Sequence, residues 1–114
     1  MPHFVIDCSE SVLRLHSAEE ILREVHDTAE ATGLFKKGDI KVRIRAFEHF
    51  RVGNEKADFI HVFGNIMEGR TVEQKANLSR QIIEKLKQMF AEVPVISINI
   101  REFEKATYCN RNMV

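Results

Sequence analysis

Alternating and helical patterns of apolar residues follow one another along this chain. Residues 3–8 alternate between two faces, with Phe4, Ile6 and Cys8 on one face and His3, Val5 and Asp7 on the other. A two-residue period of this kind predicts a strand. Because the strand begins so close to the first residue, the start of the chain is expected to be held beside a sheet, whereas most chain ends move freely in solvent.

The next stretch has the signals of a helix. Ser17 and Glu20 have the spacing of a capping box, in which two side chains satisfy two backbone N–H groups at the start of a helix. Apolar residues then recur three and four positions apart, and Thr32-Gly33 predicts the end of the helix. These apolar residues are Ala18, Ile21, Leu22, Val25 and Ala29.

Residues 40–46 return to the two-residue period and predict a second strand. Its polar face carries Lys41, Arg43 and Arg45, and its apolar face carries Ile40, Val42, Ile44 and Ala46. One face is therefore expected to enter the core, while the other carries positive charge.

The second half repeats this order. Residues 59–66 alternate and predict a third strand, which Gly69 ends. A second capping box at Thr71–Gln74 opens a helix that Pro94 ends, and residues 96–101 alternate as a last strand. The apolar positions assigned to this helix are Ala76, Ile82, Ile83, Leu86, Met89 and Phe90.

The order of elements is therefore β-α-β followed by β-α-β, which indicates an α+β fold. Right-handed connections would place both helices on one face of a four-stranded mixed sheet. With 114 residues, the chain is expected to form a single domain over residues 1–114.

The face of this sheet opposite the helices would carry mostly polar residues, and two interpretations of it stay open. It can be ordinary solvated surface, or it can face the sheets of partner subunits in a closed oligomer. Its expected residues are Lys41, Arg43, Arg45, His61, Phe63, Asn65, Asn99 and Arg101.

Composition narrows the function classes. Seventeen basic residues balance seventeen acidic ones, which gives no support for a nucleic-acid or membrane partner. No apolar run approaches the length of a membrane-spanning helix, and no signal peptide opens the chain. Cys8 and Cys109 do not make a disulfide framework, so both are expected to be reduced, in the cytoplasm.

Pro2 is the first candidate for chemistry. If Met1 is removed, Pro2 becomes the first residue and carries a free secondary amine. A proline also suits the start of a strand simply because it has no N–H to pair, so the residue alone does not decide between the two roles.

Three cations are expected to lie near that amine. The second strand brings Lys41 and Arg43 beside the first strand, and Arg70 precedes a helix N-terminus, which favours anions. Together they would hold a carboxylate substrate and would lower the pKa of the amine. The alternative is that they are surface cations paired with Glu48, Glu55 or Glu68.

Other chemistries have weaker signals. The histidines lack the spacing of a metal site, and no glycine-rich phosphate loop occurs. Cys8 is expected to be a small core residue. Aromatic residues on the third strand suggest an RNA-binding sheet, but the signature of that module is absent.

Several short motifs, in their order and spacing, resemble the 5-carboxymethyl-2-hydroxymuconate isomerase family of the tautomerase superfamily, alongside 4-oxalocrotonate tautomerase and macrophage migration inhibitory factor. The similarity covers nearly the whole chain. The motifs are Pro2-His3-Phe4, Asp7-Cys8-Ser9, Ala31-Thr32-Gly33-Leu34-Phe35, Ile40-x-x-Arg43, Gly69-Arg70 and Asn110-Arg111-Asn112.

The resemblance implies a homotrimer of β-α-β-β-α-β subunits whose sheets enclose a central barrel. It implies a cofactor-free isomerase in which Pro2 moves a proton in an unsaturated oxo or enol carboxylic acid. The implied pathway is aromatic-compound catabolism, specifically homoprotocatechuate degradation. Arg43 and Arg70 match the family's motifs, whereas Lys41 stands where the family has an arginine. Phe35 is a plausible wall of the pocket.

Two hypotheses of other classes accompany the isomerase hypothesis. A non-catalytic binding or signalling oligomer on the same scaffold would tolerate a blocked nitrogen at Pro2. An RNA-binding sheet would bind single strands with strong salt dependence.

Overall fold

The alternating stretches form the sheet that the sequence predicts. Its order is β2-β1-β3-β4, so β1 and β3 occupy the centre. β1 runs parallel to β2 and β3 runs parallel to β4, whereas β1 and β3 are antiparallel. The strands are β1 (His3–Ser9), β2 (Lys41–Phe47), β3 (Phe59–Met67) and β4 (Val95–Phe103).

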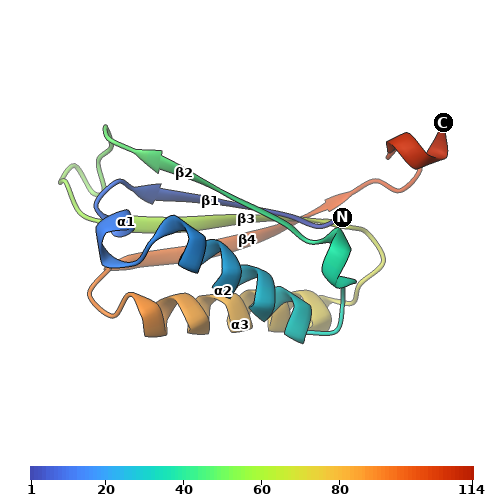
Figure 1. Ribbon diagram of the computed structural model, residues 1–114, viewed down its shortest axis with the longest axis horizontal. Helices are drawn as coiled ribbons and strands as arrows, with labels where there is room; N and C mark the ends of the chain where they lie inside the picture. The colour runs from blue at the N-terminus through green and yellow to red at the C-terminus, as the bar shows by residue number, and fades with distance from the viewer.

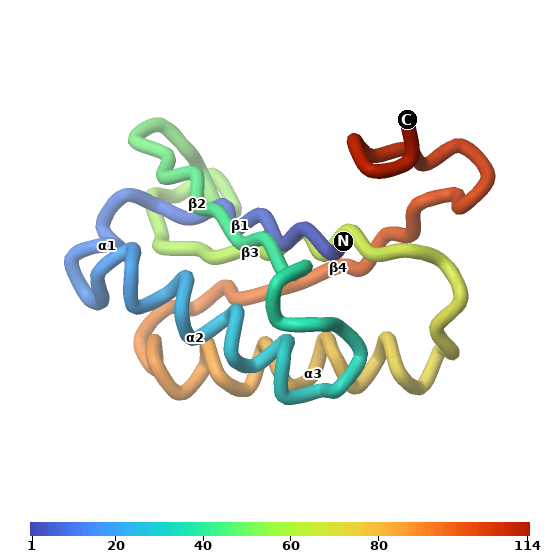
Figure 2. The backbone as a smooth tube through the Cα atoms, turned by 45° about the vertical axis from the view of Figure 1, so that its right-hand side comes forward, coloured from blue at the N-terminus to red at the C-terminus, as the bar shows by residue number.

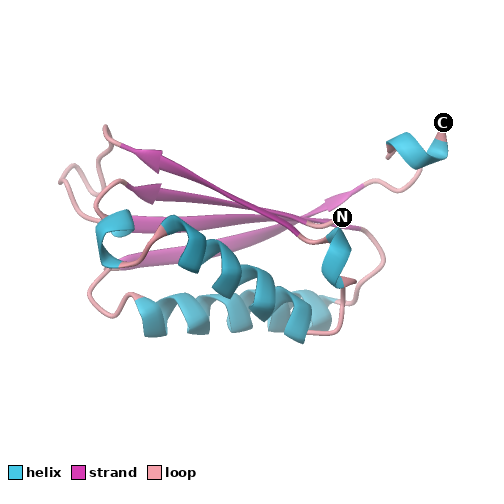
Figure 3. Ribbon diagram, in the orientation of Figure 1, coloured by secondary structure: helices cyan, strands magenta, loops and turns pink.

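Two long helices cover one face of this sheet in the computed structural model, which describes residues 1–114 (Figure 1). They are α2 (Ala18–Ala31) and α3 (Val72–Met89), one from each half of the chain. Figure 3 shows the other face of the sheet without a helix over it. The predicted β-α-β-β-α-β order and the two-layer α+β arrangement are therefore confirmed.

Three short helical segments were not predicted from the sequence. A single turn, α1 (Val12–Leu15), links β1 to α2, and its Val12 is buried. A 3₁₀ turn at Lys37–Asp39 precedes β2, and another at Arg111–Met113 lies in the tail. Such segments are too short to show a hydrophobic period.

The first predicted capping box forms only in part. The Ser17 hydroxyl accepts from the backbone N–H of Glu20, as expected, but the Glu20 carboxylate turns to His16. At the other helix both halves of the box are present, because Gln74 accepts from the backbone N–H of Thr71 in return. A nearby histidine attracts a carboxylate more strongly than a backbone amide does, which explains the difference.

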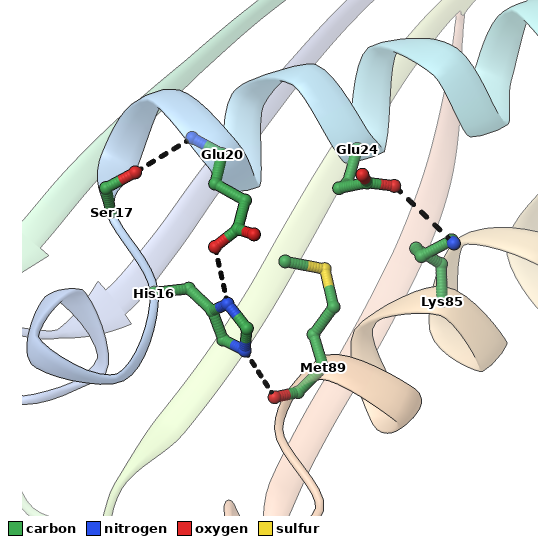
Figure 4. Close-up of polar contacts among 6 residues, drawn as sticks. All are labelled: His16, Ser17, Glu20, Glu24, Lys85 and Met89. Atoms are coloured by element: carbon green, nitrogen blue, oxygen red, sulfur yellow. Dashed lines mark hydrogen bonds and ion pairs between the residues drawn. The ribbon is translucent and has the colours of Figure 1, made fainter.

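His16 ties the start of α2 to the end of α3 (Figure 4). Its Nδ1 lies 2.5 Å from Glu20 Oε1, and its Nε2 lies 2.8 Å from the backbone oxygen of Met89. The ring also packs edge-on against Phe90, at 4.9 Å between centroids. We call this contact of His16, Glu20 and Met89 the His16 bridge.

The hydrophobic core lies between the helices and the sheet. β1 and β3 contribute Phe4, Ile6, Ile60 and Val62, all nearly inaccessible to solvent. From α3 the core takes Leu78, Ile82, Leu86 and the following Phe90. The prediction for Ala76 was wrong, since Ala76 is exposed and Leu78 is buried in that turn of the helix.

The C-terminal tail extends from the end of β4 away from the sheet and the helices (Figure 2). Only its beginning packs on the rest of the chain, where Tyr108 lies against Phe103, 6.0 Å between ring centroids. Beyond that point Met113 and Val114 are exposed.

Candidate active site

The start of the chain is fixed beside the sheet. Pro2 is buried, and its carbonyl oxygen accepts a hydrogen bond of 3.0 Å from the backbone N–H of Lys41. The amine of Met1 donates to the carbonyl oxygen of Asp39 at 3.3 Å. Parallel pairing of His3 with Lys41 continues this contact into the sheet. The first two residues thus lie between the start of β2 and the turn before it.

The surroundings of the terminal amine favour its neutral form. Partial burial lowers the pKa of the Met1 amine, and the hydrogen bond and charge of Lys41 and the charge of Arg70 lower it further. Asp39 acts in the opposite direction. Burial and neighbouring cations both disfavour a protonated amine, so the causes act together.

Lys41 directs its ammonium group toward the chain start. Its Nζ donates to the carbonyl oxygen of Asp39 at 2.7 Å, which is the carbonyl that the Met1 amine also contacts. This geometry brings the positive charge of Lys41 close to the amine, which is how Lys41 adds to the lowering of the amine pKa.

Arg70 is held by backbone carbonyls. It donates to the oxygens of Leu34 at 2.8 Å and Met67 at 3.2 Å. Its guanidinium lies over the Phe35 ring, 5.0 Å from the centroid, and that ring packs edge-on against Phe4. No carboxylate of the protein pairs with Arg70, so its positive charge is free to bind an anionic ligand. The ring of Phe35 stabilises the guanidinium through a cation–π contact.

Arg43 lies two residues after Lys41 on β2 and contacts His3, which was not among the predicted site residues. Its Nη1 donates to His3 Nδ1 at 3.1 Å. Since arginine has no acceptor, that ring nitrogen carries the lone pair, and a neutral His3 presents its N–H at Nε2. Burial, followed by the charges of Arg43, Lys41 and the terminal amine, lowers the pKa of His3.

His3 alternates with Phe4 and so belongs to the same face of β1 as Val5 and Asp7, but one histidine in a strand does not by itself indicate a function. The strand register places His3 between Lys41 and Asn65, and this position indicates that it belongs to the candidate site.

The expected alternative, in which the cations pair with glutamates, is wrong for this structure. Lys41, Arg43 and Arg70 form no ion pair, while Arg45 pairs with Asp7. Glu68, one of the suggested partners, accepts instead from the backbone N–H of Lys105.

A group of possible metal ligands lies away from this region, on the surface of α2. His26, Asp27 and Glu30 have ligand atoms within 4.8 Å of one another. Both ring nitrogens of His26 already have partners, in Asp27 and the carbonyl of Lys37. No helix of the structure is both long and apolar enough to span a bilayer.

Comparison with known proteins gives one consistent result. A sequence model of the family described as 5-carboxymethyl-2-hydroxymuconate isomerase matches residues 2–114. The 5-carboxymethyl-2-hydroxymuconate Delta-isomerase of Escherichia coli is 26% identical over 93 residues, covering 80% of this chain and 74% of that protein.

Solved structures share the fold. A 5-carboxymethyl-2-hydroxymuconate isomerase from Deinococcus radiodurans R1 superimposes with a TM-score of 0.84 at 20% identity, over 96% of this chain and 88% of that one. A fused 4-OT symmetric trimer gives a TM-score of 0.80 at 14% identity, over 98% and 94%.

Proposed function

The chain belongs to the 5-carboxymethyl-2-hydroxymuconate isomerase family and is an isomerase of the tautomerase superfamily, and we propose that Pro2, freed by removal of Met1, is its general base. The observation that carries this proposal is the position of the chain start, which is held against β2 and surrounded by cations that lower the pKa of an amine there. The nitrogen of Pro2 is one residue further into the protein than the Met1 amine. Burial and the charges of Lys41 and Arg70 are therefore expected to lower its pKa as well.

The proposed reaction moves one proton within an unsaturated oxo or enol acid: the proton leaves the enol hydroxyl or a carbon and is added to another carbon of the same molecule. The neutral Pro2 nitrogen takes a proton from one position, which leaves an enolate, and returns it to another carbon of the same substrate. An amine with an ordinary pKa of about 7.7–8.0 is largely protonated at neutral pH, so a lowered pKa increases the fraction able to accept the proton. The transfer uses no cofactor.

Lys41 and Arg70 are proposed to bind a substrate carboxylate and to stabilise the developing enolate charge. The ring of Phe35 fixes the guanidinium of Arg70 and forms a wall beside it. Arg43 is proposed to act next to them, together with the Nε2–H of His3. Lysine lacks the two-pronged geometry of arginine, so Lys41 acts as a point charge.

The proposed substrate is 5-carboxymethyl-2-hydroxymuconate or a close relative in aromatic-acid catabolism, such as homoprotocatechuate degradation. The 26% identity to the Escherichia coli enzyme supports this substrate class. A homotrimer whose sheets enclose a barrel is part of the proposal, supported by the uncovered polar face of the sheet and by the fold shared with a symmetric trimer. The cytoplasmic location and the single domain over residues 1–114 stay predictions.

The test compares three forms of the protein: one that starts at Pro2, one with residues before Pro2 that cannot be trimmed, and Pro2→Ala. Ketonisation of 2-hydroxymuconate-type acids is followed by ultraviolet absorbance, and mass spectrometry defines each first residue. The extended form is expected to lose about 100-fold or more in kcat/KM, since removal of a general base typically costs 10²–10⁴-fold.

The pH profile gives a second measurement. In the form that starts at Pro2, kcat/KM should rise with pH through a midpoint below the ordinary amine value of about 7.7–8.0. Equal activity of the extended and trimmed forms, at equal stability to urea, would remove Pro2 from the mechanism.

A further inference from the structure

A cluster of possible metal ligands lies on the helix side of the molecule, on α2. His26, Asp27 and Glu30 each offer one ligand atom, and these atoms lie within 4.8 Å of one another. No other three histidine, cysteine or acidic side chains of the chain come as close together. Because α2 packs on the face of the sheet opposite the one that the proposed trimer would enclose, such a trimer leaves the cluster accessible (Figure 1).

The spacing along the helix brings the three side chains together. Glu30 follows His26 by four residues and Asp27 by three, and residues three or four apart are neighbours on a helix surface. Val25 and Ala29 of the same turns are fully buried, so this part of α2 is anchored on the core and holds the ligands on a rigid element. The spacing of the histidines gave no indication of the cluster, because only one of its members is a histidine.

The ring of His26 is oriented by a contact from outside the cluster. Its Nε2 lies 3.3 Å from the backbone oxygen of Lys37, which can only accept, so Nε2 carries the hydrogen. Nδ1 lies 3.0 Å from Asp27 Oδ1, and in the neutral ring Nδ1 holds the lone pair. Metal-binding histidines commonly donate their other N–H to a backbone carbonyl in this way, which fixes the tautomer and the orientation of the ring.

The negative charge of the cluster is not neutralised by a lysine or an arginine. Neither Asp27 nor Glu30 forms an ion pair with such a residue, whereas Glu24, one turn earlier, pairs with Lys85 at 3.5 Å. Asp27 also lines a hollow of about 560 Å³ between α2 and α3, which gives an ion and its water a route to the cluster. A cation between the lone pair of His26 and the two carboxylates would satisfy all three groups.

We propose that His26, Asp27 and Glu30 bind a divalent transition-metal ion, zinc in particular, with water completing its coordination. One imidazole nitrogen and two carboxylate oxygens suit Zn²⁺, whereas Mg²⁺ and Ca²⁺ prefer oxygen ligands alone. The ion is structural. Lys37 belongs to the turn that precedes β2, so a bound ion holds this turn against α2 through the ring of His26. The cluster shares no residue with the proposed active site.

The probe is zinc chloride, titrated calorimetrically at neutral pH into the full chain with Cys109→Ser, because the exposed thiol of Cys109 would otherwise bind zinc itself. One saturable site per chain is expected, and His26→Gln and Glu30→Gln should each weaken zinc binding by about tenfold or more. Zinc should also raise the Tm of the parent chain but not that of His26→Gln. The matched control is His49→Gln, because His49 is exposed and its side chain forms no hydrogen bond, and it should leave the affinity unchanged.

Three results would overturn the proposal. Absence of saturable zinc binding would show that a proton on His26 closes the cluster as an ion pair. Equal zinc affinity in the parent chain and in His26→Gln, with both folded by circular dichroism, would place the zinc elsewhere. Magnesium binding as tightly as zinc would indicate attraction to acidic surface only. A zinc-dependent shift in nitrogen NMR that is larger at Nδ1 of His26 than at Nε2 would support the assigned ligand atom.

Discussion

Replacing His16 by glutamine should destabilise the protein, and the loss should depend on pH. Both partners of the ring in the His16 bridge, the Glu20 carboxylate and the Met89 carbonyl, are acceptors. Both ring nitrogens must therefore donate, which requires the imidazolium form. In agreement with this geometry, the hydrogen bond to Glu20 raises the pKa of His16 above its ordinary value of 6.5, and the Met89 carbonyl adds to the effect.

The size of the effect follows from exposure. A hydrogen bond to a charged group contributes about 1.5–3 kcal/mol when it is well buried. The side chains of His16 and Glu20 are 29% and 39% exposed, so solvent screens the pair. Surface ion pairs contribute about 0.2–1 kcal/mol. With the carbonyl bond added, a total of about 1–2 kcal/mol is expected, which corresponds to a Tm lower by roughly 5–10 °C in a chain of this size.

The sign of the pH dependence is fixed by the direction of the shift. A pKa that is higher in the folded protein than in the unfolded chain contributes stability fully below pH 6.5 and loses it as pH rises through the folded value. The free energy of unfolding, measured in urea, should therefore differ most between wild type and His16→Gln near pH 5.5–6, and least above pH 8.

A matched control separates this effect from the loss of any histidine. His49 is exposed and its side chain forms no hydrogen bond, so His49→Gln should leave the free energy of unfolding close to that of wild type. Glu20→Gln should remove most of the pH dependence while the contact with Met89 stays. A difference between wild type and His16→Gln that is constant from pH 5.5 to 8.5 would refute the imidazolium assignment.

Two further predictions concern the core and the thiols. Gly64→Ala should lower the free energy of unfolding in urea by about 1–2 kcal/mol. The new Cβ would lie 2.7 Å from Ile100 Cδ1 and 3.2 Å from the buried ring of Phe4. An unchanged midpoint of the urea transition would show that the two side chains move aside freely. Burial, aided by the charge of the preceding aspartate, raises the pKa of the Cys8 thiol to about 11. An aromatic disulfide reagent at pH 8 should therefore label one thiol per folded chain, the exposed Cys109, and two in guanidinium; equal labelling rates in the folded protein would contradict the buried position of Cys8.

Long periodic stretches made the fold predictable. The alternation at Phe4, Ile6 and Cys8 and the complete capping box at Thr71 each report a local physical preference, and nothing in the fold opposes them. Glu20 shows where prediction from local sequence fails. Its carboxylate was expected to accept from the backbone N–H of Ser17, but it contacts the ring of His16, which tertiary structure holds in place. The exposed Ala76 shows another limit, since helical spacing alone does not decide which of two adjacent stripes faces the sheet.

The candidate site was predictable in part. Parallel pairing of adjacent strands let the sequence place Lys41 and Arg43 beside the start of the chain. It gave no indication that Arg70 reaches the carbonyl of Leu34, because that contact joins a loop to a turn 36 residues away.

The sheet is a quasi-repeat of two halves, and only the first half begins at a chain terminus. His3 and Phe59 are both first in their strand and both lie opposite the first residue of a parallel neighbour. The counterpart of Pro2 in the second half is therefore Asp58, whose backbone nitrogen is part of a peptide bond. The side-chain carboxylate of Asp58 accepts hydrogen bonds from the hydroxyls of Ser9 and Ser11. A circular permutant opened before Asp58 would move the free terminus to the opposite end of the sheet, where a carboxylate stands in place of the basic cluster.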